Sequence, residues 1–163
     1  MSRWIFGLVA MLVWVCTVGA SEFSEKIWAS YDADALKPTE IFKVRDGVEL
    51  HYFAPVTARV EGNNVAHLYI HGGGFRGGSP RGFYRWSRYL AEHGVSAFAL
   101  KYRLLDREKR GKPTICVEDA KSAMRWLRAN AEKLDIDPER IAVGGNSAGA
   151  HLAAALATLE GFN

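Results

Sequence analysis

The strongest constraint on the fold is an alternation of short apolar runs with longer stretches of helical periodicity. The apolar runs have the length of strands and lie at 65–70, 95–100 and 141–143. Stretches with helical spacing or composition follow them, at 84–93, 117–134 and 148–159. A strand that is apolar on both faces is covered on both sides. The order therefore predicts an α/β domain with a mostly parallel sheet and helices on both faces.

A hairpin is predicted ahead of this alternation. Residues 41–45 and 48–53 have the pattern of strands, and Asp46-Gly47 between them suits a two-residue turn that needs a positive φ. The preceding segment, residues 21–40, shows no clean periodicity, and we interpret it as a lead-in.

The first twenty residues differ in kind from the rest. Arg3 precedes an uncharged, largely apolar run over residues 4–18, and the segment ends in short side chains at Ala20. The run is shorter than the about 20 residues of a membrane-spanning helix, so a signal peptide over residues 1–20 is favoured over an uncleaved anchor. We expect cleavage near Ala20, export to the periplasm or the exterior, and no stable membrane span afterwards.

Cleavage would also remove one of the two cysteines. Cys16 leaves with the signal peptide, so Cys116 has no cysteine with which to form an internal disulfide. We interpret Cys116, which lies between Ile115 and Val117, as a small buried apolar residue.

Composition and charge exclude several functions. Hydrophobic residues make up 48% of the chain and charged residues 24%, a globular balance, and the net charge of +3 is too small to indicate nucleic-acid binding. The densest basic run, residues 103–112, contains acids and is interpreted as a solvated loop. No histidine has a second ligand at metal-binding spacing, so we expect neither a metal nor another cofactor.

A candidate nucleophile lies between the last apolar strand and the last helix. Gly145-x-Ser147-x-Gly149 is the pattern of a sharp strand-to-helix turn that exposes a serine hydroxyl. The partial positive charge at the start of the following helix favours a developing oxyanion. A purely structural Gly/Ser turn is the alternative, but the flanking strand and helix favour a nucleophile.

A second glycine motif, His71-Gly72-Gly73-Gly74, follows the strand at 65–70. Glycines let main-chain N–H groups approach an oxyanion closely. The spacing Gly72-x-Gly74-x-x-Gly77 also matches a dinucleotide-binding fingerprint, which requires a helix at the glycines and an acid after the next strand. Ser79-Pro80 and Lys101-Tyr102 stand there instead, so the nucleotide interpretation is disfavoured.

These two motifs, in this order and about seventy residues apart, resemble those of the α/β-hydrolase superfamily. The resemblance covers about residues 41–161 and is closest to the hormone-sensitive-lipase-like enzymes and the acetyl-xylan and feruloyl esterase-like group. It implies the N-terminal portion, over residues 41–163, of an α/β-hydrolase domain. It also implies a serine esterase that forms an acyl-enzyme on small-acyl or carbohydrate esters.

The resemblance also assigns roles to individual residues. Ser147 is implied to be the catalytic nucleophile, and the backbone N–H groups of Gly73, Gly74 and Ala148 to form the oxyanion hole. His71 is implied to hold the glycine motif in shape.

The catalytic acid and histidine of such enzymes follow the serine in the chain. Here Glu160 and His151 are the only acid and histidine after Ser147. His151 lies one helical turn beyond the serine and is expected to pack rather than to act as the base. We therefore expect the sheet to be truncated after the helix at 148–159, and these 163 residues alone to be inactive.

Two other interpretations stay open from the sequence. One is a serine peptidase of the prolyl-oligopeptidase type, which the His-Gly-Gly-Gly motif disfavours. The other is a catalytically dead fragment or binding module with an exposed sheet edge. The acyl and alcohol groups of the substrate and the oligomeric state cannot be read from the sequence.

Overall fold

The computed structural model describes residues 22, 24–32, 34–57, 64–106 and 111–160. Internal contacts divide the chain into two units, residues 1–35 and 36–163. In the first unit, residues 24–30 are helical, and the predicted signal peptide lies outside the described residues. No helix in the described ranges is long and apolar enough to cross a membrane.

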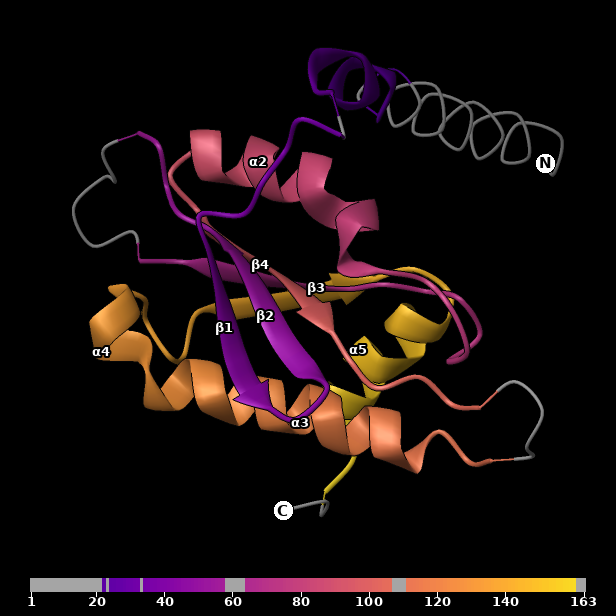
Figure 1. The fold of residues 1–163 in the computed structure, drawn as a ribbon. Helices are drawn as coiled ribbons and strands as arrows, with labels where there is room; N and C mark the ends of the chain where they lie inside the picture. Colours follow the sequence, from indigo (N-terminus) through magenta and orange to yellow (C-terminus); the bar gives the residue numbers. More distant parts are fainter. Residues whose placement is uncertain (1–21, 23, 33, 58–63, 107–110, 161–163) are drawn as a thin grey trace, which may run out of the picture. The chain divides into compact units, whose positions relative to one another are not determined.

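The second unit is built on a five-stranded sheet with the order β1-β2-β4-β3-β5 (Figure 1). The strands are β1 (Glu40–Arg45), β2 (Val48–Phe53), β3 (Ala66–Ile70), β4 (Ser96–Lys101) and β5 (Ile141–Gly145). β2 is antiparallel to both of its neighbours, whereas β3 is parallel to β4 and β5. Four of these five strands therefore point the same way, which confirms the predicted mostly parallel sheet.

The predicted hairpin is present as β1 and β2. Arg45 pairs with Val48 across the two-residue turn, and Gly47 takes a φ of +75°. This conformation is open to glycine at little cost, which explains the Asp-Gly pair.

Helices cover both faces of the sheet, as expected from the sequence. They are the short η1 (Pro80–Phe83), α2 (Tyr84–Glu92), α3 (Thr114–Ala129), α4 (Ala131–Leu134) and α5 (Ala148–Thr158). α2 lies on one face of the sheet, and α3, α4 and α5 lie on the other (Figure 1). The larger apolar core lies on the α3 side and includes Leu50, Leu68, Phe98 and Leu127.

Two expectations about the helices were wrong. The apolar stripe over 117–134 belongs to two helices, because Asn130 leaves helical geometry and its Nδ2 donates to the Trp126 carbonyl at 2.8 Å. The apolar composition of residues 148–159 suggests a mostly buried helix, but only Ala148, Gly149 and Leu152 of α5 are buried. Among the described elements, β5 is the last strand at its end of the sheet, so no described strand pairs with its outer edge.

Asp119 is a buried charged residue that holds a loop in place. It is fully buried in α3 and accepts hydrogen bonds from the backbone N–H of Arg103 at 2.9 Å and from its guanidinium at 2.5 Å. The pair therefore ties the loop after β4 to α3.

His67 makes the free energy of unfolding depend on pH. Burial lowers the pKa of its imidazole from 6.5 to about 4. Between these values the unfolded chain binds a proton that the folded chain does not, so stability is lost as the pH falls from 6.5 towards 4. The loss reaches about 3 kcal/mol at 1.36 kcal/mol per pKa unit. We expect His67→Phe to flatten this dependence in urea unfolding measured at several pH values. Parallel pH profiles for the two proteins would contradict it.

Candidate active site

Ser147 occupies a strained turn between β5 and α5. Its φ of +49° and ψ of −120° lie where residues with a Cβ are rarely found. α5 begins at the next residue, Ala148, so Ser147 stands at the N-terminus of an 11-residue helix. The serine is exposed. The turn thus combines the strain, exposure and helix position of a nucleophile elbow.

Both glycines of this turn are required by close contact with the end of β3. A Cβ at Gly145 would overlap the carbonyl oxygen of Ile70 and lie 2.7 Å from the carbonyl carbon of Gly149. A Cβ at Gly149 would overlap the same Ile70 oxygen and lie 2.8 Å from the carbonyl oxygen of His71. Backbone atoms cannot rotate away as a side chain can, so only glycine lets β3 and α5 approach this closely.

The loop after β3, residues 71–78, is called the glycine loop below. Gly73 and Gly74 have φ values of +117° and +60°, and Phe75 has a φ of +62°. Within the described part of the chain, the backbone N–H groups of Gly73, Gly74 and Ala148 donate to no other protein group. Free N–H groups beside a nucleophile are what an oxyanion hole requires. Ile70 pairs with Gly145, so the parallel strands bring the glycine loop and the serine turn to one edge of the sheet.

Asn146 joins the serine turn to the glycine loop. Its Oδ1 accepts a hydrogen bond from the Gly72 N–H at 2.8 Å, and its carbonyl accepts one from the Gly149 N–H at 2.8 Å. A Cβ at Gly72 would lie 2.7 Å from the Asn146 carbonyl oxygen. The role of Asn146 is not predictable from the sequence, because its partner is 74 positions away and no local pattern links the two.

His71 is buried, and contacts with Gly72 and Tyr102 fix its position. Its Nδ1 donates to the carbonyl oxygen of Gly72 at 2.8 Å, and its ring stacks on Tyr102 with centroids 4.4 Å apart. The Tyr102 hydroxyl donates to the His71 carbonyl at 2.9 Å. Burial lowers the pKa of His71, so the ring is neutral at neutral pH. These contacts hold the start of the glycine loop.

His151 engages the backbone of the serine turn. Its Nδ1 donates to the Ser147 carbonyl at 3.0 Å, and the ring makes an edge contact with Phe75, with centroids 6.4 Å apart. No side chain in the described ranges hydrogen-bonds to the Ser147 hydroxyl. The described residues therefore place an exposed serine hydroxyl beside N–H groups that have no protein acceptor, and no side chain among them contacts that hydroxyl as a base would.

Neither a metal centre nor a reactive thiol supplements these groups in the part of the chain that the structure describes. No cluster of three or more His, Cys, Asp or Glu side chains there could hold a metal ion. Cys116 is buried and donates to the Arg103 carbonyl at 3.3 Å. Burial raises the pKa of its thiol to about 11, so it is an inert apolar residue, as expected.

Comparison with known proteins identifies relatives of the second unit. Residues 55–163 match the model of the BD-FAE family. An AB hydrolase superfamily protein of Schizosaccharomyces pombe is 30% identical over 82% of this chain and 38% of its own length. The ethyl acetate hydrolase of Pseudomonas putida is 43% identical over 57% of this chain and 29% of its own length. The chain spans about a third of the length of these curated relatives.

Solved structures give the same fold. Esterase Est2 of Thermogutta terrifontis, solved with butyrate bound, superimposes with a TM-score of 0.64 at 36% identity. The match covers 71% of this chain and 43% of that esterase. Structural and sequence relatives therefore agree on esterases with an α/β architecture.

Proposed function

Because the chain belongs to the BD-FAE family, in the esterase and lipase branch of the α/β-hydrolases, we propose that it carries the nucleophile and oxyanion hole of a serine carboxylic ester hydrolase. The observation that carries the proposal is the 2.8 Å hydrogen bond from the Gly72 N–H to Asn146. It joins the loop with free N–H groups to the turn that holds Ser147.

The reaction is acyl transfer in two steps. The Ser147 Oγ forms a bond to the ester carbonyl carbon as its proton passes to a base, and the carbonyl oxygen becomes an oxyanion. The N–H groups of Gly73, Gly74 and Ala148 donate to this oxyanion. The bond to the alcohol oxygen then breaks, and the alcohol leaves with the proton. In the second step, water attacks the carbonyl carbon of the acyl-enzyme in the same way. The bond to the Ser147 Oγ then breaks, the carboxylic acid leaves, and the serine hydroxyl is restored.

We propose that the catalytic acidic residue and the general base of this reaction come from outside these 163 residues. These 163 residues alone are then inactive. The 3.0 Å bond of His151 to the Ser147 carbonyl supports this, because that bond occupies Nδ1 with backbone rather than with the hydroxyl. The order serine, acid, histidine in α/β-hydrolases supports it too.

Small-acyl esters, including esters of carbohydrates, are the proposed substrates. A relative is named ethyl acetate hydrolase, and the Est2 structures include butyrate-bound and propionate-bound forms. We also propose that the protein is exported through the signal peptide at residues 1–20 and meets its substrates outside the cytoplasm.

Organophosphate labelling tests the proposal. Est2 of Thermogutta terrifontis has been solved phosphorylated by paraoxon. We expect paraoxon to phosphorylate Ser147 in the natural gene product, with the adduct located by peptide mass spectrometry. Ser122→Ala, a change of a half-buried serine in α3 whose hydroxyl donates to the Glu118 carbonyl, should leave the labelling intact. An unmodified Ser147 peptide would overturn the esterase proposal and favour a binding module.

The contact between Asn146 and the glycine loop leads to a graded prediction. Asn146→Ala removes the acceptor for the Gly72 N–H, so we expect kcat to fall about tenfold, less than the 10²–10³ of losing an oxyanion donor outright. Asn146→Asp keeps an acceptor oxygen and should retain more activity than Asn146→Ala. Hydrolysis of p-nitrophenyl acetate by the natural gene product measures both, with Asn130→Ala, between α3 and α4, as the matched control. Equal activity of the two Asn146 variants would contradict a role for the hydrogen bond.

A further inference from the structure

The glycine loop holds a conformation that its own sequence does not favour. Gly73, Gly74 and Phe75 follow one another with φ values of +117°, +60° and +62°. A phenylalanine with a positive φ costs free energy, so such a conformation persists only where the surroundings fix it. Inside the loop, the Arg76 N–H donates to the Gly73 carbonyl at 3.1 Å. The contacts that hold the two sides of the loop come from elsewhere in the chain.

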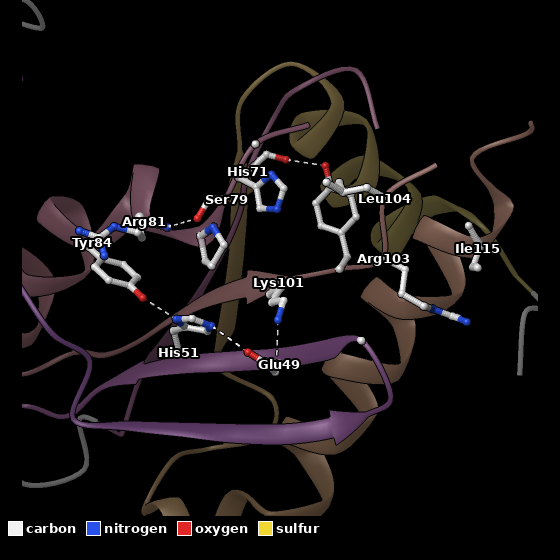
Figure 2. A pocket seen from close by; sticks show the side chains of 14 residues that line it. Glu49, His51, His71, Ser79, Arg81, Tyr84, Lys101, Arg103, Leu104 and Ile115 are labelled. Carbon is white, nitrogen blue, oxygen red and sulfur yellow. Dashed lines mark hydrogen bonds and ion pairs between the residues drawn. The ribbon is translucent and has the colours of Figure 1, made fainter. Parts of the chain in front are cut away.

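The segment that follows β4, residues 102–105, bonds to the glycine loop at two carbonyl groups. The Tyr102 hydroxyl donates to the His71 carbonyl at 2.9 Å, a bond drawn as a dashed line at His71 in Figure 2. The Leu105 N–H donates to the Phe75 carbonyl at 2.8 Å. These two carbonyls flank the proposed oxyanion donors of the loop in the chain. We call residues 102–105 the clamp segment.

The peptide group between His71 and Gly72 is bonded at both ends. Its carbonyl accepts from Tyr102, and its N–H donates to Asn146 Oδ1 at 2.8 Å. Because a peptide group is planar, hydrogen bonds at its two ends fix the orientation of the plane and strengthen each other. A continuous chain of hydrogen bonds therefore runs from the clamp segment through the glycine loop to the serine turn.

The clamp segment is itself held by α3 through Arg103. The Arg103 N–H donates to Asp119 at 2.9 Å, and the guanidinium makes further hydrogen bonds to the same carboxylate. The Arg103 carbonyl accepts from the Cys116 Sγ at 3.3 Å. Both partners are fully buried, and the Arg103 side chain points away from His71 (Figure 2). Asp119 thus restrains the backbone of the clamp segment from the α3 side.

The hydroxyl of Tyr102 is the part of this residue whose role can be isolated. Tyr102 is 2% exposed, and its ring stacks on the imidazole of His71. Burial raises the pKa of the hydroxyl to about 12, so it stays protonated and can donate at neutral and mildly alkaline pH. A phenylalanine at this position keeps the ring contact and removes only the donor.

We infer that Tyr102 is a positioning residue for the oxyanion hole, and that Asp119 acts on the same hole through the clamp segment. The Tyr102 hydroxyl fixes the peptide that precedes Gly73, so the free N–H groups of Gly73 and Gly74 keep their orientation. Both residues act through others, so neither is a catalytic residue. The inference rests on the proposed esterase function, because the oxyanion forms in that reaction. Misplaced donors weaken the transition state more than the bound substrate, which lowers kcat and leaves KM nearly constant.

Tyr102→Phe tests the positioning role in the natural gene product. We expect kcat on p-nitrophenyl acetate to fall about tenfold, less than the 10²–10³ of losing an oxyanion donor outright. KM should stay within about twofold of the wild type. A kcat within about twofold of the wild type, or a change in KM alone, would overturn the inference.

Tyr52→Phe is the matched control for Tyr102→Phe. It also removes a buried tyrosine hydroxyl, one that lies 3.3 Å from Ser96 Oγ, and it keeps a stacked ring, whose centroid is 4.7 Å from that of Phe98. The two variants therefore lose the same group from comparable surroundings, and Tyr52→Phe should leave kcat unchanged. An equal loss of kcat in both would assign the effect to general loosening of the core.

Backbone amide chemical shifts report on the oxyanion donors without requiring activity. In NMR spectra of the ¹⁵N-labelled gene product, Tyr102→Phe should shift the amide signals of Gly73 and Gly74 and leave that of Ala148 in place. A wild type that hydrolyses no ester overturns the proposed function, and the inference with it. An active wild type whose Gly73 and Gly74 signals do not respond to Tyr102→Phe overturns the inference alone.

A double-mutant cycle tests the part of Asp119. Asp119→Asn keeps an acceptor oxygen for the Arg103 N–H, so it should fold more readily and lose less kcat than Asp119→Ala. If Asp119 acts through the clamp segment, the effects are not additive, and Tyr102→Phe should lower kcat by less than about tenfold in the Asp119→Asn background. Urea unfolding establishes that each variant is folded under the assay conditions. A full tenfold loss in that background would show that Asp119 acts independently of Tyr102 and would contradict its inferred role.

Discussion

From the proposed function we expect Ser147→Ala to lower the kcat of the natural gene product on p-nitrophenyl acetate by about 10⁶-fold, the loss typical when a triad nucleophile is removed. The reason is that no other group replaces the Oγ atom in the covalent step. Gly73, Gly74 and Ala148 keep their N–H groups, so KM should change far less than kcat. Steady-state kinetics measure the effect.

Stability provides the control for this variant. Alanine and serine have a similar conformational free-energy cost at the φ of +49° that position 147 adopts. The melting temperature should therefore stay near that of the wild type. Ser122→Ala should be neutral in both measurements. A folded Ser147→Ala protein with kcat within tenfold of the wild type would remove Ser147 from its proposed role.

Gly149→Ala produces the largest expected loss of stability. The new Cβ would overlap the Ile70 carbonyl oxygen and lie 2.6 Å from its carbon. Relief requires β3 and α5 to separate, and overpacking of this kind typically costs about 1–3 kcal/mol and more where only backbone can move. We expect a loss above about 3 kcal/mol in urea unfolding, or failure to fold.

Gly82→Ala is the matched control for Gly149→Ala. No heavy atom lies within 4 Å of a Cβ built at Gly82, and its φ is not in the positive range that disfavours side chains. The two variants therefore add the same methyl group to crowded and to open space. Equal unfolding free energies would show that β3 and α5 are not in the close contact described.

The local sequence pattern was sufficient to predict most of the strands and helices in the second unit. Asp46-Gly47 predicted the hairpin because few residue pairs suit a two-residue turn, and Gly47 takes the expected positive φ there. Asn130 shows where local pattern fails. The apolar spacing continues through it, but its side chain hydrogen-bonds to Trp126 and the helix ends.

The candidate site divides in the same way. Ser147 and its two glycines are recognisable because the turn itself dictates small residues at fixed spacing. Asn146 and Asp119 are not, because their partners Gly72 and Arg103 are distant in sequence and the type of side chain does not identify them.

The order of strands and helices, the strained serine turn and the glycine loop follow from the sequence, because periodicity and backbone conformation are local properties. The placement of β3 between β4 and β5 is different, since it depends on which strands bury each other's apolar faces. That placement brings the glycine loop against Asn146. Packing between segments far apart in the sequence, rather than any single motif, therefore brings the parts of the candidate active site together.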